Sequence, residues 1–347
     1  MRAVLVRDLG APEVLRVETV PEPQMRPGEV TIKVDACGIC FHDVVARNGT
    51  MRRGVKLPYI PGHEVAGTVV DRSPEVTQFK IGDRVATTLR RYICGHCRFC
   101  RSGREASCEE RESFGDAGLN GGCAEFVCVG EDNVGLVPDE VSLDHAAIAA
   151  CAIGTQLNAV RDVARIALGE RVLVLGAGGG LGIHGIQLAK LAGGEVLAVT
   201  STAAKIDVIR AAGADRVVLI ERGEDFSAKV RAATGGAGVD VVIDNVGTPV
   251  FRAVRRSLAP CARWVFAGQV TGDFAEFSPA QLFFNGTTLM SAKSGSREQL
   301  RDVLGLLQRG AVRAVVPQSF PLEEIARAHA MVEAGATTGR VVVRPGG

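Results

Sequence analysis

Four cysteines share one short segment of the chain, at Cys94, Cys97, Cys100 and Cys108. Their spacing, C-x2-C-x2-C-x7-C, is typical of thiolates that surround one tetrahedral zinc ion within a single loop. A complete sulfur shell leaves no position for a substrate, so the pattern predicts a structural metal site. His96 is a spare ligand that four thiols make unnecessary. Unrelated cysteines, or a zinc ribbon that binds nucleic acid, are the alternatives.

Three further potential metal ligands, Cys40, His63 and Cys151, are scattered along the first half of the chain. Two cysteines and one histidine form a catalytic zinc set whose fourth position stays open to water or substrate. Their spacing alone does not show that they meet. A lone buried cysteine is usually a small hydrophobic residue, and a lone histidine is usually part of a core.

A glycine-rich turn follows the apolar segment Arg171–Leu175 and precedes a helix that we predict to end near Leu191. Glycines allow the backbone to approach a dinucleotide pyrophosphate, and the free amides at a helix start attract its charge. The spacing is best described as Ala177-x-Gly179-x-x-Gly182. The expected cofactor contacts are Gly176, Ala177, Gly179, Gly180, Leu181 and Gly182, with Gly268 after the predicted strand Arg263–Ala267.

The second strand of this region ends without the acidic residue that NAD-binding proteins normally place there. The segment reads Val199-Thr-Ser-Thr-Ala-Ala-Lys205 instead. An acid would repel a ribose 2′-phosphate, whereas hydroxyl groups and a cation would hold it. We therefore expect NADP(H), contacted by Ser201, Thr202 and Lys205; a solvent-exposed helix residue is the alternative for Lys205.

The elements that must position these residues change character near Cys151. Residues 1–150 contain short strand-like stretches separated by Gly and Pro, which favours a mostly antiparallel β domain. After Cys151, strands alternate with helices, which indicates an α/β fold with a parallel, doubly wound sheet. The predicted strands are Arg2–Val6, Glu29–Val34, Val65–Val70, Asp83–Thr87, Arg171–Leu175, Val196–Val199, Arg216–Leu219, Val239–Ile243, Arg263–Ala267, Thr288–Ser291, Ala314–Val316 and Val341–Val343.

The length and charge of the chain limit the functions to consider. A chain of 347 residues is long enough for two domains. Its net charge of +1, without a basic patch, disfavours nucleic acid or an anionic membrane as a partner. The N-terminus lacks the apolar core of a signal peptide. We expect a cytoplasmic protein, in which closely spaced cysteines more often bind metal than form disulfides.

Taken together and in order, several segments resemble the zinc-containing medium-chain dehydrogenase/reductase family. The resemblance implies a GroES-like β domain over 1–151 and 293–347, around a Rossmann domain over 152–292, with the active site between them. Stretches at Gly178–Gln187 and Val242–Thr248 are similar to the acryloyl-CoA reductase branch. The segments that carry the family resemblance are Cys37–Asp43, Gly62–Gly67, Gly82–Val85, Cys94–Cys108 and Cys151–Thr155.

The resemblance also implies roles for individual residues. Cys40, His63 and Cys151 match the catalytic zinc ligands of the family. Glu64 matches a carboxylate beside the metal, Asp43 an acid that orients the ligand histidine, and Thr155 a residue near the nicotinamide ring. Zinc would act as a Lewis acid on a carbonyl or alkoxide oxygen.

Two positions depart from the family pattern: Ser73, where the family has a small Gly or Ala at a turn, and His42. Family alcohol dehydrogenases usually place Ser or Thr two residues after the first zinc cysteine, where it passes on the alcohol proton. This chain has His42 there. A histidine exchanges protons near neutral pH, so His42 either takes over this relay or faces elsewhere.

The resemblance implies a homodimer or homotetramer that interconverts small alcohols and aldehydes or ketones. Reduction of the C=C bond of an α,β-unsaturated thioester or ketone is the enzymatic alternative. A nucleotide-binding protein without turnover is the alternative from another class. Loops around Gly49–Pro58 and Ser113–Gly122 are expected to shape the substrate pocket.

Overall fold

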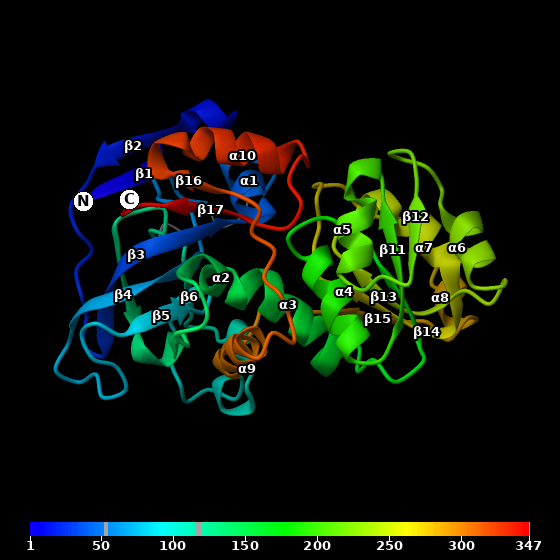
Figure 1. Cartoon of the computed structure of the whole chain (residues 1–347), viewed down its shortest axis with the longest axis horizontal. Helices are drawn as coiled ribbons and strands as arrows, with labels where there is room; N and C mark the ends of the chain where they lie inside the picture. The colour runs from blue at the N-terminus through cyan, green and yellow to red at the C-terminus, as the bar shows by residue number, and fades with distance from the viewer. Residues whose placement is uncertain (52–54, 116–118, 347) are drawn as a thin grey trace. The chain divides into compact units, whose positions relative to one another are not determined.

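The computed structural model describes residues 1–51, 55–115 and 119–346, and it divides into two compact units (Figure 1). Residues 52–54 and 116–118, in the two loops expected to shape the substrate pocket, lie outside the described residues. Unit 1 contains residues 1–154 and 294–347, and unit 2 contains residues 155–293. The chain therefore leaves unit 1 after Gly154 and returns at Ser294.

Unit 1 is built on a seven-stranded sheet in the order β16-β17-β3-β4-β5-β9, with β8 also paired to β3. The long central strand β3 pairs antiparallel with β4, β8 and β17. Its apolar side chains are almost fully buried, so this strand forms the centre of the unit's core. The strands of unit 1 are β1 (Arg2–Val6), β2 (Leu15–Thr19), β3 (Glu29–Ile39), β4 (Glu64–Arg72), β5 (Arg84–Thr87), β6 (Arg90–Tyr92), β7 (Glu112–Ser113), β8 (Phe126–Gly130), β9 (Val134–Leu136), β16 (Ser319–Pro321) and β17 (Val341–Arg344).

The helices of unit 1 pack around the sheet. α10 contacts α1 and β17, and α9 contacts β9 and a π-helical segment, η5. A π-helical turn is rare and is often found at functional sites. The bounds are α1 (Phe41–Arg47), α2 (Leu143–Ala147), η5 (Ala149–Ile153), α9 (Arg297–Gln308) and α10 (Ile325–Glu333).

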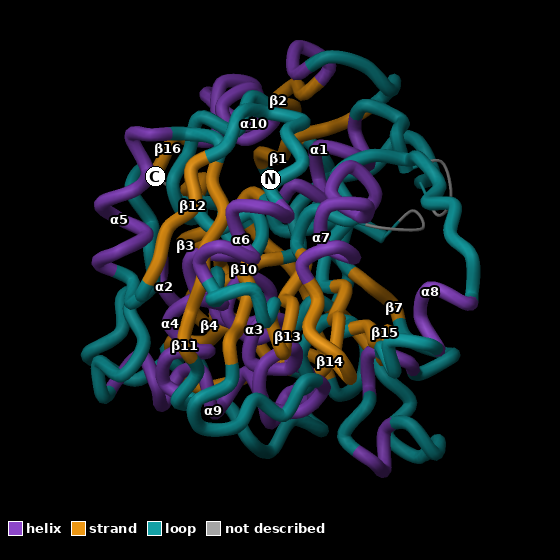
Figure 2. Tube along the Cα trace, turned by 90° about the vertical axis from the view of Figure 1, so that its right-hand side faces the viewer, coloured by secondary structure: helices purple, strands orange, loops and turns teal. Residues whose placement is uncertain are grey.

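Unit 2 contains a six-stranded sheet in the order β12-β11-β10-β13-β14-β15. Every adjacent pair of these strands is parallel, which confirms the predicted doubly wound sheet. Figure 2 shows β13 and β14 side by side in this sheet. The strands are β10 (Arg171–Val174), β11 (Glu195–Thr200), β12 (Arg216–Leu219), β13 (Val239–Asp244), β14 (Leu258–Phe266) and β15 (Thr288–Ser291).

Helices connect the parallel strands of unit 2. From β10 the chain steps to β11 and β12, and then crosses to β13 and β14 in the opposite direction. Right-handed crossovers therefore place α4 and α5 on one face of the sheet, and α6 and α7 on the other (Figure 1). The bounds are α3 (Gly154–Leu157), α4 (Gly182–Leu191), α5 (Ile206–Ala211), α6 (Ser227–Ala233), α7 (Phe251–Ser257) and α8 (Ala280–Phe283).

The core of unit 2 includes the single tryptophan of the chain. Trp264 is fully buried in β14, and its indole Nε1–H donates to Asp244 Oδ2 over 3.0 Å. Its ring lies against Phe251 and Phe266, with centroid distances of 4.6 and 4.9 Å. The indole thus gains both apolar contact and a hydrogen bond, as buried tryptophans usually do.

One predicted strand is wrong. Ala314–Val316 forms no strand, and β16 begins three residues later at Ser319. Pro317 follows this segment directly and has no N–H to continue a ladder. The segment instead accepts one backbone hydrogen bond, from the Arg340 N–H to the Val315 carbonyl at 2.9 Å.

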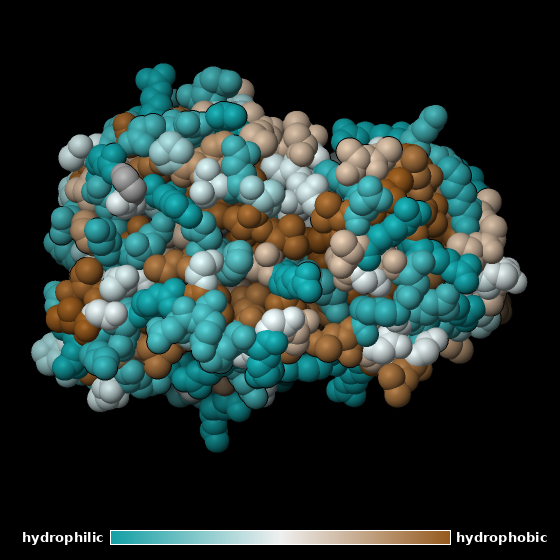
Figure 3. All heavy atoms as spheres, in the orientation of Figure 1, coloured by the Kyte–Doolittle hydropathy of each residue, from teal (hydrophilic) through white to brown (hydrophobic). Residues whose placement is uncertain are grey.

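Hydrophilic side chains cover most of the face of the molecule shown in Figure 3, with smaller hydrophobic areas between them. Among the described residues, no helix is both long and apolar enough to cross a bilayer.

Candidate metal centres and cofactor site

Four side chains that are far apart in sequence meet in unit 1. Cys40, His63, Glu64 and Cys151 each offer one ligand atom within 4.8 Å of the others. The two sulfurs are 4.0 Å apart, and all four residues are buried. The structure thus brings together the three predicted catalytic ligands and the predicted neighbouring carboxylate. Two sulfurs and a nitrogen at this separation can share one metal ion.

Three different local structures position these ligands. Cys40 is the N-cap of α1, directly after β3. His63 follows Gly62, whose φ of +97° suits glycine, and whose added Cβ would lie 2.6 Å from Cys37 Sγ. Cys151 lies in the middle of η5. The antiparallel pairing of β3 with β4 brings the first two ligands together.

Asp43 fixes the orientation of the His63 ring. Its Oδ1 lies 3.2 Å from His63 Nδ1, and its Oδ2 accepts from the Cys40 backbone N–H at 2.8 Å. Burial opposes ionisation of Asp43, but the neighbouring His63 outweighs it and holds the pKa of the carboxyl well below its usual range. An ionised carboxylate only accepts hydrogen bonds. His63 Nδ1 is therefore the donor, which leaves Nε2 available as a ligand.

Glu64 and Arg340 form a buried pair beside the sulfurs. Arg340 Nη2 lies 2.9 Å from Glu64 Oε1 and 3.9 Å from Cys151 Sγ. Neither Glu64 oxygen has a partner with hydrogen-bond geometry among the described residues. Burial raises the pKa of Glu64 to about 7, against the opposing effect of Arg340. A buried carboxylate without a hydrogen bond, close to two thiols and an imidazole, is an environment that a divalent cation would satisfy.

His42 and Thr155 flank the ligand residues in sequence. The His42 ring lies edge-on to the His63 ring, with centroids 5.3 Å apart, and its side chain is partly exposed. His42 is thus close to the cluster and reachable by solvent. Thr155 is buried and lies in α3, at the first residue of unit 2.

The four-cysteine loop is closed as the spacing predicts. The sulfur atoms of Cys94, Cys97, Cys100 and Cys108 lie within 4.8 Å of one another. Backbone N–H groups of Cys97 and Cys100 donate to the sulfurs of Cys94 and Cys97, over 3.4 and 3.5 Å. Such bonds stabilise thiolates, and the one from the Cys100 N–H is the largest cause that lowers the pKa of Cys97 to about 7. Cys94, His96 and Glu110 form an overlapping group, but it has only one sulfur.

The glycine-rich turn of unit 2 connects β10 to α4. Gly176 has a φ of +61°, and the Gly179 N–H donates to its carbonyl over 2.9 Å. A Cβ at Gly182 would collide with the same carbonyl, so only glycine fits at the first residue of α4. Gly180 accepts from His184 Nδ1–H over 2.7 Å, and Ala177 is buried. Leu181 precedes α4, so this turn presents backbone amides at a helix start.

The residues predicted to select NADP lie at the end of β11. Ser201 and Thr202 are exposed directly after this strand. Lys205 extends back over the turn, because a Cβ at Gly178 would lie 2.6 Å from its Cδ. Gly268 follows β14, and its N–H donates to the Asp244 carbonyl over 3.2 Å. The carboxyl ends of β10, β11 and β14 thus carry all the predicted contacts, where nucleotides bind in such sheets.

Two relevant residues were missed or misjudged from the sequence. Arg340 carried no signal, because only the return of β17 to β3 brings it to Cys151. His329 is not among the residues that the sequence analysis singles out. It is fully buried on α10, and neither ring nitrogen has a partner among the described residues. Its position four residues after the buried Ile325 places it on the core-facing side of α10.

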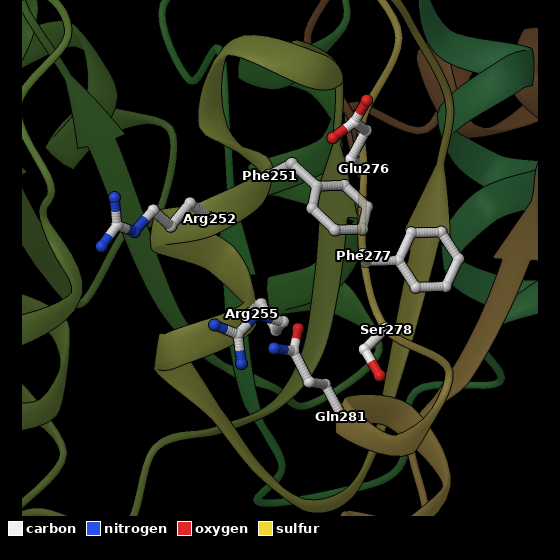
Figure 4. Close-up of a pocket in the computed structure, with 7 residues that line it drawn as sticks. All are labelled: Phe251, Arg252, Arg255, Glu276, Phe277, Ser278 and Gln281. Atoms are coloured by element: carbon white, nitrogen blue, oxygen red, sulfur yellow. The ribbon is translucent and has the colours of Figure 1, made fainter.

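A separate pocket of about 530 Å³ lies on unit 2, between α7 and the segment that leads into α8 (Figure 4). The rings of Phe251 and Phe277 stack at a centroid distance of 5.6 Å. The polar ends of Arg255 and Gln281 lie close together, and Arg252 points away from them. None of the predicted site residues lines this pocket.

Comparisons with known families agree with this architecture. The Alcohol dehydrogenase GroES-like domain matches residues 26–139, and the Zinc-binding dehydrogenase family matches residues 212–343. The curated relatives include an alcohol dehydrogenase from Geobacillus stearothermophilus, 33% identical with 99% of both chains covered. An acryloyl-coenzyme A reductase from Sulfurisphaera tokodaii is 31% identical, with 99% of this chain and 100% of the relative covered. A NAD-dependent alcohol dehydrogenase from Sulfolobus acidocaldarius is 30% identical, with 99% of both covered.

Among solved structures, AibC superposes with a TM-score of 0.91 at 38% identity, covering 100% of this chain and 96% of that one. The chain belongs to the zinc-containing medium-chain dehydrogenase/reductase family, and it is an oxidoreductase with a GroES-like and a Rossmann fold. The predicted family and fold class are thereby confirmed.

Proposed function

We propose that the protein is a zinc-dependent, NADP(H)-linked oxidoreductase that interconverts an alcohol and an aldehyde or ketone. The observation that carries this proposal is the meeting of Cys40, His63 and Cys151 in one buried cluster. Bound there, zinc would supply a Lewis acid that polarises the substrate oxygen. Cys94, Cys97, Cys100 and Cys108 would hold a second, structural zinc ion.

The residues around the cluster have separate tasks in this proposal. Asp43 holds the His63 ring so that Nε2 faces the sulfurs. Arg340 offsets the negative charge that Glu64 and two thiolates bring into a buried site. His42 donates the proton to the product oxygen during reduction and accepts it during oxidation. A histidine with one side toward solvent can exchange that proton with water.

For the nucleotide, we propose that the turn Gly176–Gly182 holds the pyrophosphate and that Lys205 and the hydroxyls of Ser201 and Thr202 hold a 2′-phosphate. The support is the position of Lys205 over Gly178, at a strand end that carries no carboxylate. Gly268 would contact the cofactor and Thr155 would lie near the nicotinamide. Unit 1 would then be the catalytic domain and unit 2 the NADP-binding domain.

Reduction of a conjugated C=C bond is the second candidate. The full-length relative named acryloyl-coenzyme A reductase favours it, as does a histidine where alcohol dehydrogenases carry a hydroxyl. In this reaction hydride from the nicotinamide reaches the β-carbon, and a proton reaches the α-carbon. The metal ligands suit both reactions, since each has a carbonyl oxygen to polarise.

One comparison of substrates distinguishes the two proposed reactions and the non-catalytic alternative. Oxidation of NADPH is followed by loss of nicotinamide absorbance with a panel of aldehydes and ketones, and with enoyl thioesters. Turnover of the first set alone supports the alcohol–carbonyl reaction, and turnover of thioesters alone supports C=C reduction. Binding of NADPH without turnover of either set would favour the non-catalytic alternative. Metal analysis of the same preparation should find two zinc ions per chain.

We also propose a homodimer or homotetramer that continues the sheet of unit 2 across β15. This strand ends the described sheet, so its outer edge is available for pairing. Phe274, Phe283 and Phe284 in the preceding segment are 96%, 64% and 84% exposed. Large exposed aromatic groups commonly mark interfaces. Light scattering coupled to size exclusion should give two or four chains per particle; a monomer at micromolar concentration would contradict this.

A further inference from the structure

The four-cysteine loop is suspended from a short antiparallel ribbon. β6 ends two residues before Cys94, and β7 begins four residues after Cys108. The two strands pair through Arg90–Ser113 and Tyr92–Glu112. Any ion that cross-links the four sulfurs therefore also fixes the end of this ribbon. Arg90 is the first residue of β6, four residues before Cys94; we call this start of the ribbon the neck of the loop.

The Arg90 side chain crosses from this neck to the segment where the chain re-enters unit 1. Its Nη2–H donates to the Gly295 carbonyl over 2.7 Å, and its Nη1–H donates to Ser294 Oγ over 3.3 Å. Ser294 has a φ of +55°, a conformation that non-glycine residues rarely adopt unless neighbouring contacts hold it. The two arginine contacts provide such a hold.

The re-entry segment lies against the segment that carries Cys151. A Cβ at Gly295 would lie 3.2 Å from the Ala150 carbonyl oxygen and 3.5 Å from the Gly154 carbonyl carbon. Ser296 then caps α9 through reciprocal hydrogen bonds with Gln299, and α9 packs against η5. A continuous series of contacts thus runs from the neck of the loop, through Arg90 and Gly295, to Ala150 and Gly154, which lie on either side of Cys151.

Arg90 is also a buried cation, and the carboxylate of Glu105 acts on it electrostatically without forming an ion pair. It is 2% exposed, and no carboxylate forms an ion pair with it among the described residues. Four thiolates around one zinc ion would carry net negative charge, and Cys100 and Cys108 are close enough to act electrostatically on Arg90. A loaded loop would thereby stabilise the buried guanidinium.

We propose that Arg90 is a positioning residue that couples the four-cysteine metal site to Cys151, so that loading of the loop strengthens metal binding at the Cys40–His63–Cys151 site. The inference rests on the two metal sites of the proposed function. Arg90 touches neither substrate nor cofactor in this role. It acts through the backbone that holds one ligand of the second site.

The test measures metal affinity rather than activity. Zinc is titrated against a chromophoric chelator in the full-length protein, in Arg90→Met, in Cys100→Ser and in the double variant. Because a supporting partner of a ligand usually contributes 10- to 100-fold in metal affinity, and Arg90 lies further out, we expect a loss of about tenfold in each single variant. The double variant should lose no more than either single one, because both changes break the same series of contacts. Cobalt substituted at the three-ligand site should show altered thiolate absorption bands in Arg90→Met.

Two further variants keep the result interpretable. Arg90→Lys keeps the charge but lacks the planar guanidinium that reaches two acceptors. Its zinc affinity should therefore lie between those of Arg90→Met and the unaltered protein. It should also remain folded if Arg90→Met does not. Arg72→Met removes another arginine contact to a backbone carbonyl, that of Val76, and should leave metal affinity unchanged. Unchanged affinity in folded Arg90→Met, or additive losses in the double variant, would overturn the coupling. A metal content of only one zinc ion in the unaltered protein would overturn both the coupling and the proposed structural site. Two zinc ions, with no change of affinity in Arg90→Met, would overturn the coupling and leave the proposed function intact.

Discussion

Asp43 Oδ1 lies 3.2 Å from His63 Nδ1, while the same carboxylate accepts from the backbone N–H of Cys40 through its other oxygen. One buried side chain thus holds two of the three proposed metal ligands, one by its ring and one by its backbone. The carboxylate stays ionised because the adjacent histidine outweighs the effect of burial on its pKa.

Asp43→Asn is therefore expected to weaken zinc binding at this site by about 10- to 100-fold. The amide keeps the volume but loses the charge that orients the imidazole and increases its basicity. Chelator competition measures the affinity. Asp71→Asn, an exposed change in β4, serves as the control. Equal zinc affinity in Asp43→Asn and the unaltered protein would remove Asp43 from the metal-supporting role.

The proposed proton relay predicts a kinetic effect at His42. His42→Ala should lower turnover about 100-fold or more, within the range for a lost general acid–base group, and remove one limb of the pH profile. Zinc content should stay the same, because His42 is not among the clustered ligands. His145→Ala, on α2, is the matched histidine control. If turnover and the pH profile are both unaffected, the relay proposal fails.

Cofactor selection should depend on Lys205. Lys205→Ala is expected to weaken NADPH binding about tenfold or more and to leave NADH binding nearly unchanged, since only NADPH carries the 2′-phosphate that the ammonium would meet. Fluorescence titration with both nucleotides gives the two dissociation constants. Lys190→Ala, which breaks an ion pair with Asp215 at the end of α4, is the control. Tighter binding of NADH than of NADPH by the unaltered protein would refute the NADP preference.

The buried His329 should make stability depend on pH. Burial lowers its pKa to about 4, with Asp43 and Glu333 opposing this shift and Arg47 adding to it. Between its ordinary value of 6.5 and about 4, the unfolded chain binds a proton that the folded chain refuses. The contribution is complete above pH 6.5 and is lost as the pH falls toward 4, by about 3 kcal/mol.

His329→Leu should remove this dependence. Urea denaturation gives the unfolding free energy of each protein. The value for the unaltered protein minus the value for the variant should decrease steadily as the pH falls from 6.5 to 4. The same measurement on a variant of the α2 residue His145, His145→Gln, serves as the histidine control. A difference that stays constant over this range would mean that His329 takes up its proton in the folded state as readily as in the unfolded one.

The parts of the site that could be predicted from the sequence are those formed by a single short segment of the chain. The four-cysteine loop and the turn Gly176–Gly182 each contain their own geometry within one segment. Cys40 and His63 meet because of the register of β3 against β4. Cys151 reaches them from a π-helical turn. The spacing of these residues in the sequence could not show either contact. Family resemblance supplied these expectations instead.

Other features could be found only in the folded chain. Arg340 is separated from Cys151 in sequence by all of unit 2, and the pairing of Val341 with Ile39 returns it to the cluster. His329 had a usable signal, because Ile325 and Ala328 continue the same buried helical face. The position of His329 on the same helical face as these apolar residues therefore indicated that it is buried.

The discontinuity of unit 1 has a consequence for how the protein is made. β17 is the last strand among the described residues, and it pairs with β3 in the central sheet. During synthesis on the ribosome, the sheet formed by the first 154 residues therefore keeps an open edge beside β3 until residues 341–344 have emerged. Arg340 arrives with the same strand. The nascent chain can close its four-cysteine loop early, but it completes the surroundings of Cys151 only after Arg340 has emerged.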